Sequence, residues 1–377
     1  MSTSLAHKIA LDPTPEQREF FQRAAGVSRF TWNWALAEWQ EGYQQDEKPN
    51  GHLLKKSFNA LRRVQFPWTY DVHRDATARP FADLQRAFVN FWAGRADYPR
   101  FKKKGKGRDS FYLACDKFHV DGKTATLPKI GPIKMREALR FEGKILGATV
   151  SREAARWFIS IQVQMNAHSR DRTADGCVGV DLGITNLATL STGEAIEGPK
   201  PLKQTRKQLR RTNRTLHRRH LGSVNREKTK RRVARLYARM AHIRTDALHK
   251  LTAKLCRENQ VVSIEDLHVK GLLKNKRLSR SISDMGWGEC RRQLEYKAPL
   301  YGTQLKIIGR FEPSSKMCSH CKAVKPVLTL GERLFICNAC GHMEDRDLNA
   351  AKNINQLGQA MPEVTPVEKR SAGLGFG

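Results

Sequence analysis

The sequence predicts an α/β protein with more than one domain, and three observations support this. The chain has 377 residues, whereas single hydrophobic cores stop growing at about 250–300 residues. Aromatic residues near the N-terminus recur every three or four positions, as in helices, while later segments are short and apolar or alternate apolar and polar residues, as strands do. Near the C-terminus, two pairs of cysteines have the spacing of a small metal-stabilised unit.

The N-terminal region predicts helices. Thr14 can cap a helix in which Gln17 completes a capping box. The aromatic spacing that follows predicts two helices in succession, the first around Phe20 and the second around Trp34. Similar spacing continues to about residue 94, so we expect a helical lobe over residues 12–109.

The end of this lobe is a strongly basic stretch, residues 98–108. Its glycine, proline and charged residues leave no packing pattern, which predicts a flexible loop. We expect this loop to contact the phosphates of a nucleic acid. The candidate contact residues are Arg100, Lys102, Lys103 and Lys104.

Short strands follow from residue 110. Residues 157–165 alternate apolar and polar side chains, which predicts an antiparallel strand with one buried face. We expect this region to pair with the strand predicted at residues 7–11. The helical lobe would then be an insertion into a small β-barrel formed by residues 1–11 and 110–167.

A buried strand that ends on a carboxylate organises the second half of the chain. Val178 and Val180 face a core, while Gly179 and Asp181 share the opposite face. A return strand over residues 186–192 predicts a hairpin. Taken alone, an acid at a strand end can also cap an element or pair with an arginine, so a catalytic role for this one requires partners.

The balance of charge predicts a polyanionic partner. The chain has 68 Lys and Arg against 37 Asp and Glu, a net charge of +31, and its pI is near 10.2. The excess positive charges repel one another in the free protein, and a polyanionic partner would neutralise them. Nucleic acid is a better candidate for this partner than a membrane, because no apolar run of about 18 residues is present. The N-terminus lacks the apolar core of a secretion signal, so we expect a reducing cytoplasm.

The most basic segment is residues 203–239. Apolar residues recur every three or four positions from Val233 to Leu255, which predicts a long amphipathic helix. Its cations could simply be solvated, but few acids are interleaved with them, which favours nucleic-acid contact. The candidate contact residues are Arg206, Arg210, Arg214, Arg218, Arg219 and Arg232.

Four cysteines form two CxxC pairs separated by fifteen residues. This spacing is typical of a structural zinc held by four thiolates, with no open coordination position. Disulfides are the alternative, and the lack of a secretion signal disfavours them. We therefore expect one structural Zn²⁺ bound by Cys318, Cys321, Cys337 and Cys340.

Two further segments supply carboxylates. Residues 261–265 form a second short apolar strand that ends in Glu265, and an acidic cluster that opens a helix contains Asp347, for which helix capping is the alternative role. Oxygen ligands of this kind suit Mg²⁺, and two such ions can activate a water and stabilise a leaving 3′ oxygen. Asp181, Glu265 and Asp347 are therefore candidate metal ligands and catalytic residues of a phosphodiesterase.

The order of these parts resembles the TnpB family, RNA-guided DNA endonucleases encoded by bacterial insertion sequences and related to type V CRISPR effectors. The resemblance covers nearly the whole chain. One departure is Lys322, which stands where a glycine would follow the first cysteine pair. The motifs that carry the resemblance are Pro99-Arg-Phe-Lys-Lys-Lys104, Gly179-Val-Asp-Leu-Gly183, Ile264-Glu-Asp-Leu267, the segments 281–287 and 293–297, the paired CxxC and Asp345-Arg-Asp-Leu-Asn-Ala-Ala351.

The resemblance implies an α/β multidomain architecture. A split RuvC nuclease domain of RNase H-like fold would occupy residues 168–312 and 344–357, with a zinc ribbon inserted at 313–343. Residues 358–377 contain proline and glycine and show no periodicity, which predicts a flexible tail. The N-terminal barrel would be wedge-like, and its helical insertion would be a recognition lobe.

The resemblance also implies the chemistry and the partners. The three catalytic acids of the family, which act with two Mg²⁺ ions, match Asp181, Glu265 and Asp347 of this chain. In the last motif the match is to Asp347 and not to Asp345. The expected partners are a guide RNA derived from the transposon end and target double-stranded DNA beside a short flanking motif, in the bacterial cytoplasm at the nucleoid and without a membrane.

Three alternatives stay open. The protein could be an RNA-guided DNA-binding repressor that has lost nuclease activity, although all three acids are present. It could be a transposase that joins DNA ends with the same acids. It could also be a ribosome-associated or RNA-binding factor that carries a zinc ribbon.

Overall fold

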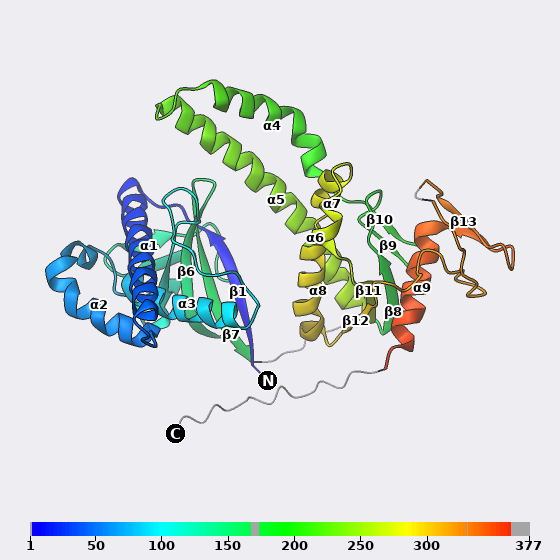
Figure 1. Ribbon diagram of the computed structural model, residues 1–377, viewed down its shortest axis with the longest axis horizontal. Coiled ribbons are helices and arrows are strands. Elements are labelled where there is room, and N and C mark those ends of the chain that lie inside the picture. Colours follow the sequence, from blue (N-terminus) through cyan, green and yellow to red (C-terminus); the bar gives the residue numbers. More distant parts are fainter. Residues whose placement is uncertain (1, 167–172, 330, 363–377) are drawn as a thin grey trace. The chain divides into compact units, whose positions relative to one another are not determined.

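The computed structural model describes residues 2–166, 173–329 and 331–362 (Figure 1). The chain divides into two compact units, Met1–Ala167 and His168–Gly377, which are described one at a time. None of the helices in the described ranges combines the length and the apolar character needed to span a bilayer.

The N-terminal unit contains two antiparallel sheets around one hydrophobic core. β1 lies antiparallel to β7 with Ile9 opposite Ile159, which confirms the predicted pairing of the first strand. Side chains of both sheets, including Leu113 and Ile133, share the core. The four-stranded sheet has the order β1 (Ser2–Ala10), β7 (Arg156–Asn166), β6 (Lys144–Glu153) and β2 (Ser110–Ala114), and the three-stranded sheet has the order β3 (His119–Asp121), β4 (Thr124–Leu127) and β5 (Gly131–Lys134).

The helices of this unit are α1 (Pro15–Gln44), α2 (Gly51–Gln65) and α3 (Asp75–Trp92), with short 3₁₀ turns at Pro67–Asp71 and Cys115–Lys117. The capping box at Thr14 and Gln17 is present. The two helices expected before residue 45 are one helix. Its first half, with Phe21, packs on the strands, and its second half, with Trp39, packs on α2 and α3. Because the packing partner changes along this one helix, the sequence pattern was interpreted as two helices.

The C-terminal unit is built on a five-stranded sheet. β8 and β11 are parallel neighbours, β12 continues the parallel part, and β9 and β10 extend the sheet antiparallel on the other side. The predicted hairpin is present, with Asp181 opposite Thr189. The strand order is β10 (Ala195–Ile196), β9 (Ala188–Leu190), β8 (Gly176–Asp181), β11 (Asn259–Glu265) and β12 (Gln304–Ile308).

Helices cover both faces of this sheet (Figure 1). Val178 and Val180 face a core with α5, α7 and α8, and α9 packs on the opposite face. Because α9 continues to Ala360, residues 358–360, expected to belong to a flexible tail, are helical, and residues 363–377 of that prediction lie outside the described residues. The helices are α4 (Pro201–Arg218), α5 (Val224–Glu258), α6 (Val269–Leu272), α7 (Ser279–Met285), α8 (Trp287–Tyr301) and α9 (Arg346–Ala360).

A small cysteine-containing subdomain lies between β12 and α9 in the chain. It contains a two-stranded ribbon, β13 (Leu334–Ile336) with β14 (Met343–Asp345). Phe335 is fully buried there against two of the cysteines. The hydrophobic core of this subdomain is small, so another stabilising element is expected.

Candidate functional site

The sheet brings the first two predicted acids to one edge. β8 and β11 are parallel with Val180 opposite Ile264, so Asp181 and Glu265, the next residues, end neighbouring strands on the same side. Adjacent strands lie about 4.8 Å apart. The two carboxylates, distant in sequence, therefore occupy neighbouring positions at the end of the sheet.

Helix α9 adds Asp347 to this edge. A Cβ atom at Gly179 would lie 2.2 Å from the carbonyl oxygen of Ala351, so only glycine lets the α9 backbone come this close to β8. Asp181 lies two residues beyond this glycine on the same face, and Asp347 lies one turn before Ala351. The first turn of α9 is thereby set beside the strand ends.

The neighbouring acid, Asp345, caps helix α9. Its carboxylate accepts hydrogen bonds from the backbone N–H groups of Asp347 (2.9 Å) and Leu348 (3.0 Å), so it is the N-cap of α9. The capping role considered for Asp347 is thus performed by Asp345. This arrangement supports Asp347 as the site residue.

The electrostatics of Asp181 show that the three acids interact. Burial raises the pKa of Asp181 to about 7, and the negative charges of Glu265 and Asp347 add to the rise. Like charges in a desolvated site disfavour ionisation. Near neutral pH this carboxyl group is therefore protonated more readily than an exposed aspartate.

Glu265 and Asp347 have polar partners. The hydroxyl of Ser314 donates to Oε1 of Glu265. Asp347 pairs with Arg346 at 3.1 Å and with Arg333 of the ribbon at 3.8 Å. Sequence analysis missed Ser314 and Arg333, because each lies in the inserted subdomain, far along the chain from the acids.

The donor set fits a hard cation. Three carboxylates supply only oxygen ligands, which Mg²⁺ prefers, and a bound cation would offset the repulsion that Glu265 and Asp347 add to the effect of burial on Asp181. Within the described ranges, one group of three or more His, Cys, Asp or Glu residues has its ligand atoms all within 4.8 Å of one another, and this group is the four cysteines. The three carboxylates are therefore more widely spaced than one tight ligand shell.

The four predicted zinc ligands meet in the C-terminal subdomain. The Sγ atoms of Cys318 and Cys340 are 3.8 Å apart, and those of Cys321 and Cys337 are 3.5 Å apart. A tetrahedral zinc with Zn–S bonds of about 2.3 Å needs sulfur atoms about 3.8 Å apart, whereas a disulfide needs about 2.05 Å. The cluster therefore fits zinc and not two disulfides.

The two cysteine turns are alike despite their different sequences. Lys322 donates its N–H to the carbonyl of Cys318, as Gly341 does to that of Cys337, both at 3.0 Å. Lys322 has φ +66° and Gly341 has φ +73°. The lysine thus takes the left-handed conformation of the glycine, and its departure from the pattern leaves the turn unchanged. The backbone N–H of Cys340 helps to lower the pKa of Cys337 to about 6, which favours the thiolate.

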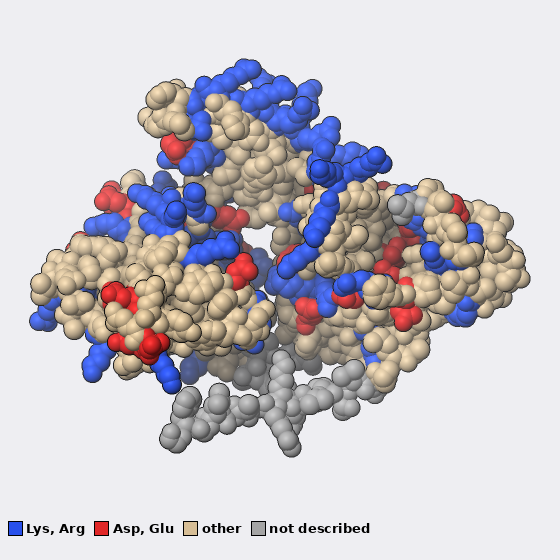
Figure 2. Space-filling model, viewed as in Figure 1, with Lys and Arg blue, Asp and Glu red and all other residues tan. Residues whose placement is uncertain are grey.

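The most basic segment forms a hairpin of α4 and α5 around a small apolar core of Leu209, Val233, Leu236 and Met240. The predicted amphipathic helix lies within α5, and α4 was not predicted. Figure 2 shows Lys and Arg side chains gathered along α4. Asp284 of α7 holds the start of α4, because its carboxylate accepts from the N–H groups of Leu202 and Lys203. The arginines that line one groove of α4, spaced four residues apart, are Arg206, Arg210, Arg214 and Arg218.

These four arginines have no acidic side chain within salt-bridge distance in the described part of the chain. Arg219 and Arg232 line a neighbouring groove. Arg219 also donates to the carbonyl of Asn225 and so helps to hold the connection between the two helices. The grooves are suited to a polyanion.

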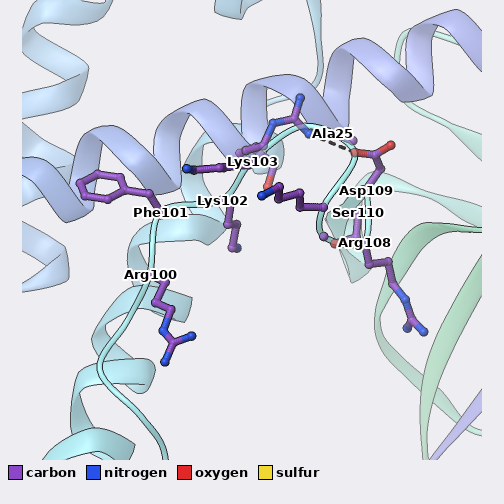
Figure 3. A pocket seen from close by; sticks show the side chains of 12 residues that line it. Ala25, Arg100, Phe101, Lys102, Lys103, Arg108, Asp109 and Ser110 are labelled. Atoms are coloured by element: carbon purple, nitrogen blue, oxygen red, sulfur yellow. Dashed lines mark hydrogen bonds and ion pairs between the residues drawn. The ribbon is translucent and has the colours of Figure 1, made fainter. Parts of the chain in front are cut away.

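A basic cavity of about 690 Å³ is also present in the N-terminal unit. Figure 3 shows its labelled residues, including Arg100, Lys103 and Arg108. The expected flexible loop is anchored to α1 instead. Asn33 exchanges two hydrogen bonds with the backbone of Lys102 (2.7 and 2.9 Å).

Two of the four predicted contact residues in this loop are involved in that anchoring. The Nζ atom of Lys102 lies over the Trp32 ring, 3.7 Å from its centroid, and the carbonyl of Arg100 accepts from the indole N–H of Trp32 at 3.1 Å. Lys103 lines the cavity of about 690 Å³, and Lys104 lines an adjoining one of about 520 Å³.

Three family models match the chain. "Probable transposase" matches residues 160–276, "Cas12f1-like, TNB domain" matches residues 287–354, and "Helix-turn-helix domain" matches residues 1–48. Within this last range, residues 15–44 form one continuous helix.

Relatives match over almost the full length. A protein of Streptomyces pristinaespiralis named "Putative RNA-guided DNA endonuclease" is 39% identical over 94% of this chain and 89% of its own. A protein of Escherichia coli K12 named "Putative RNA-guided DNA endonuclease InsQ" is 32% identical over 94% of this chain and 92% of its own.

The fold has a solved counterpart. The Cas12f1 chain in a complex titled with sgRNA and target DNA matches with a TM-score of 0.55 at 14% identity, over 91% of this chain and 83% of that one. At this identity the match shows the fold alone. The identity and coverage of the two relatives show that this chain belongs to the TnpB family, as its motifs predict.

Proposed function

We propose that this protein is an RNA-guided DNA endonuclease of an insertion-sequence transposon. It binds a guide RNA derived from the transposon end and cleaves target DNA beside a short flanking motif. The observation that carries this proposal is the meeting of Asp181 and Glu265 at the ends of parallel strands, with Asp347 on the adjoining helix. The names of the full-length relatives support the same activity.

The proposed nuclease domain is a split RuvC domain of RNase H-like fold. Residues 168–312 and 344–357 would form it, with the zinc ribbon at residues 313–343. The support is the mixed sheet, with parallel β8, β11 and β12 and antiparallel β9 and β10, and α9 on one face. In the N-terminal unit, the strands would form the wedge and the helices the recognition lobe.

Asp181, Glu265 and Asp347 would hold two Mg²⁺ ions. When bound, these ions would supply a water nucleophile at neutral pH and charge stabilisation for the leaving 3′ oxygen. Arg346 and Arg333, which flank Asp347, place positive charge beside the site where a phosphodiester would lie, and the zinc site is structural because all four of its ligands are cysteines.

The basic grooves would hold the backbone of the guide–target hybrid. In such systems base pairing reads the sequence, while the protein recognises the shape and charge of the heteroduplex. The unpaired arginines of α4 offer a row of cations for phosphates. Each neutralised phosphate releases condensed counterions, so binding should weaken steeply with salt.

The direct test starts from the RNA that copurifies with the protein. Sequencing this RNA names the guide, and a plasmid that carries the matching sequence, with flanking positions randomised, is then the substrate. We expect Mg²⁺-dependent cleavage next to a short motif by the wild-type complex. Asp181→Ala, Glu265→Ala and Asp347→Ala should bind the target and not cut it.

The same test separates two of the three alternatives. Target binding without cleavage by the wild-type complex would indicate a repressor, and cutting at a fixed site by RNA-free protein would indicate a transposase. Asp345→Ala is the matched control. It removes the cap of α9 without removing a proposed ligand, so it should lower stability more than it lowers the rate of cleavage at saturating Mg²⁺.

A further inference from the structure

Buried polar side chains connect the cysteine subdomain to the acidic site. Ser314, Asn349 and Asn353 have 2%, 0% and 0% of their surface exposed. Ser314 lies in the segment that leads from β12 to the first cysteine, and the two asparagines lie on α9, two and six residues after Asp347. Most buried polar groups of this kind have hydrogen-bond partners.

The two asparagines fix the backbone of this segment. Asn353 donates from Nδ2 to the carbonyls of Ser314 (2.9 Å) and Met317 (2.6 Å). Asn349 donates to the carbonyl of Met317 and accepts from the N–H of Ser319, both at 2.8 Å. Helix α9 therefore holds the segment on both sides of the first cysteine.

The segment also contacts the end of β11 directly. Arg310 pairs with Asp266 at 3.0 Å, and the Ser314 hydroxyl donates to Glu265. The backbone around Ser314 is fixed by the asparagines, so its hydroxyl reaches Glu265 from a defined point. A hydrogen bond to a carboxylate restricts the directions in which its remaining lone pairs can point.

We propose that Ser314 is a positioning residue that orients Glu265 for metal binding, with Asn349 and Asn353 as its supports. The inserted cysteine subdomain thereby becomes part of the active-site framework. This inference rests on the proposed nuclease function. Residues that orient metal ligands typically change metal affinity by about 10- to 100-fold when replaced.

The test uses the full chain with its copurified RNA and measures the cleavage rate of the matching plasmid against Mg²⁺ concentration. Ser314→Thr keeps the hydroxyl, and Ser314→Val has the same shape as threonine without it. We expect Val to raise the half-saturating Mg²⁺ concentration about 10- to 100-fold and Thr to stay near wild type. Ser314→Ala, which adds no volume, should behave as Val does.

A merely structural role would give a different result. A variant that folds poorly lowers the maximal rate because less enzyme is active, but it leaves the half-saturating Mg²⁺ concentration unchanged. Ser315→Ala is the matched control, because no hydrogen bond of the Ser315 hydroxyl is among the contacts of the described chain. Equal effects of Thr and Val, or an unchanged half-saturating concentration in Val and Ala, would overturn the proposal.

The outcome also separates this inference from the function on which it rests. Cleavage by Asp181→Ala would refute the proposed site and, with it, the role of Ser314. An inactive Asp181→Ala together with a Ser314→Val that matches wild type would refute only the positioning role. A readout without cleavage is the Mg²⁺ concentration that half-saturates the rise in melting temperature of the complex, which should increase about 10- to 100-fold in Ser314→Val and stay near wild type in Ser314→Thr.

Discussion

Replacing Asp181 by asparagine should stabilise the free protein at pH 8 while abolishing cleavage. The carboxyl has a pKa of 3.8 in its ordinary state and of about 7 in the folded protein. Between these values the folded chain keeps a proton that the unfolded chain releases, so stability falls as pH rises from about 4 to 7. Asparagine carries no charge and escapes this loss.

The size of the effect follows from the shift. A change of about three pKa units corresponds to roughly 4 kcal/mol. Asp181 is partly accessible to solvent, and screening lowers the expected gain to about 1–3 kcal/mol. For a unit of this size, each kcal/mol moves the melting temperature by about 2–4 °C.

The assay is thermal unfolding of wild type and Asp181→Asn at pH 4.5 and pH 8, without added divalent ions. A chelator must be avoided because it would also remove zinc. Asp266→Asn is the matched control, since hydrogen bonding to Arg291 lowers the pKa of Asp266, so this variant should lose stability at pH 8. If Asp181→Asn were no more stable than wild type at pH 8, burial and the two neighbouring acids would not raise the pKa of Asp181 as described.

Four further changes test other parts of the structure. Asp284→Ala removes the acceptor for the first N–H groups of α4 and should cost about 1 kcal/mol in a denaturant titration. Arg210→Gln with Arg214→Gln should weaken RNA binding and reduce the slope of log K against log salt by about 0.7–0.9 for each phosphate that is no longer neutralised. Removal of zinc by a chelator should release one equivalent, measured with a zinc indicator, and unfold the ribbon. Gly179→Ala should force α9 away from β8 and lower both stability and cleavage, whereas Gly288→Ala, whose Cβ would meet open space, should lower neither.

The sequence identified the strand ends because their pattern is local. Alternation placed Val178 and Val180 in a core and Asp181 on the other face, and the structure agrees. The parallel pairing of β8 with β11 is not local, since its two strands are separated by the α4–α5 hairpin. The repeated motif, an apolar strand ending in an acid, and the resemblance to the TnpB family were what suggested that Glu265 would join the first carboxylate.

Contacts between distant segments explain what the sequence could not predict. The basic loop looked flexible because its own residues show no packing pattern, yet Asn33 on α1 anchors its backbone at Lys102. No sequence pattern marked Ser314 either, because its position is fixed by two buried asparagines more than thirty residues away, which bind the backbone of its segment. Such partners become visible only once α9 is folded against the sheet.

The choice between Asp345 and Asp347 follows from the way α9 begins. An N-cap side chain turns back toward the first N–H groups of its own helix, and the bonds from Asp345 to Asp347 and Leu348 commit it to this direction. Asp347, in the first turn, is free of that task. Because Gly179 lets α9 pack tightly on β8, this first turn lies at the strand ends, and the positive end of the helix dipole then favours anionic oxygens there. The cap formed by Asp345 and the close approach at Gly179 thus favour Asp347 as the aspartate that we propose acts with Asp181 and Glu265.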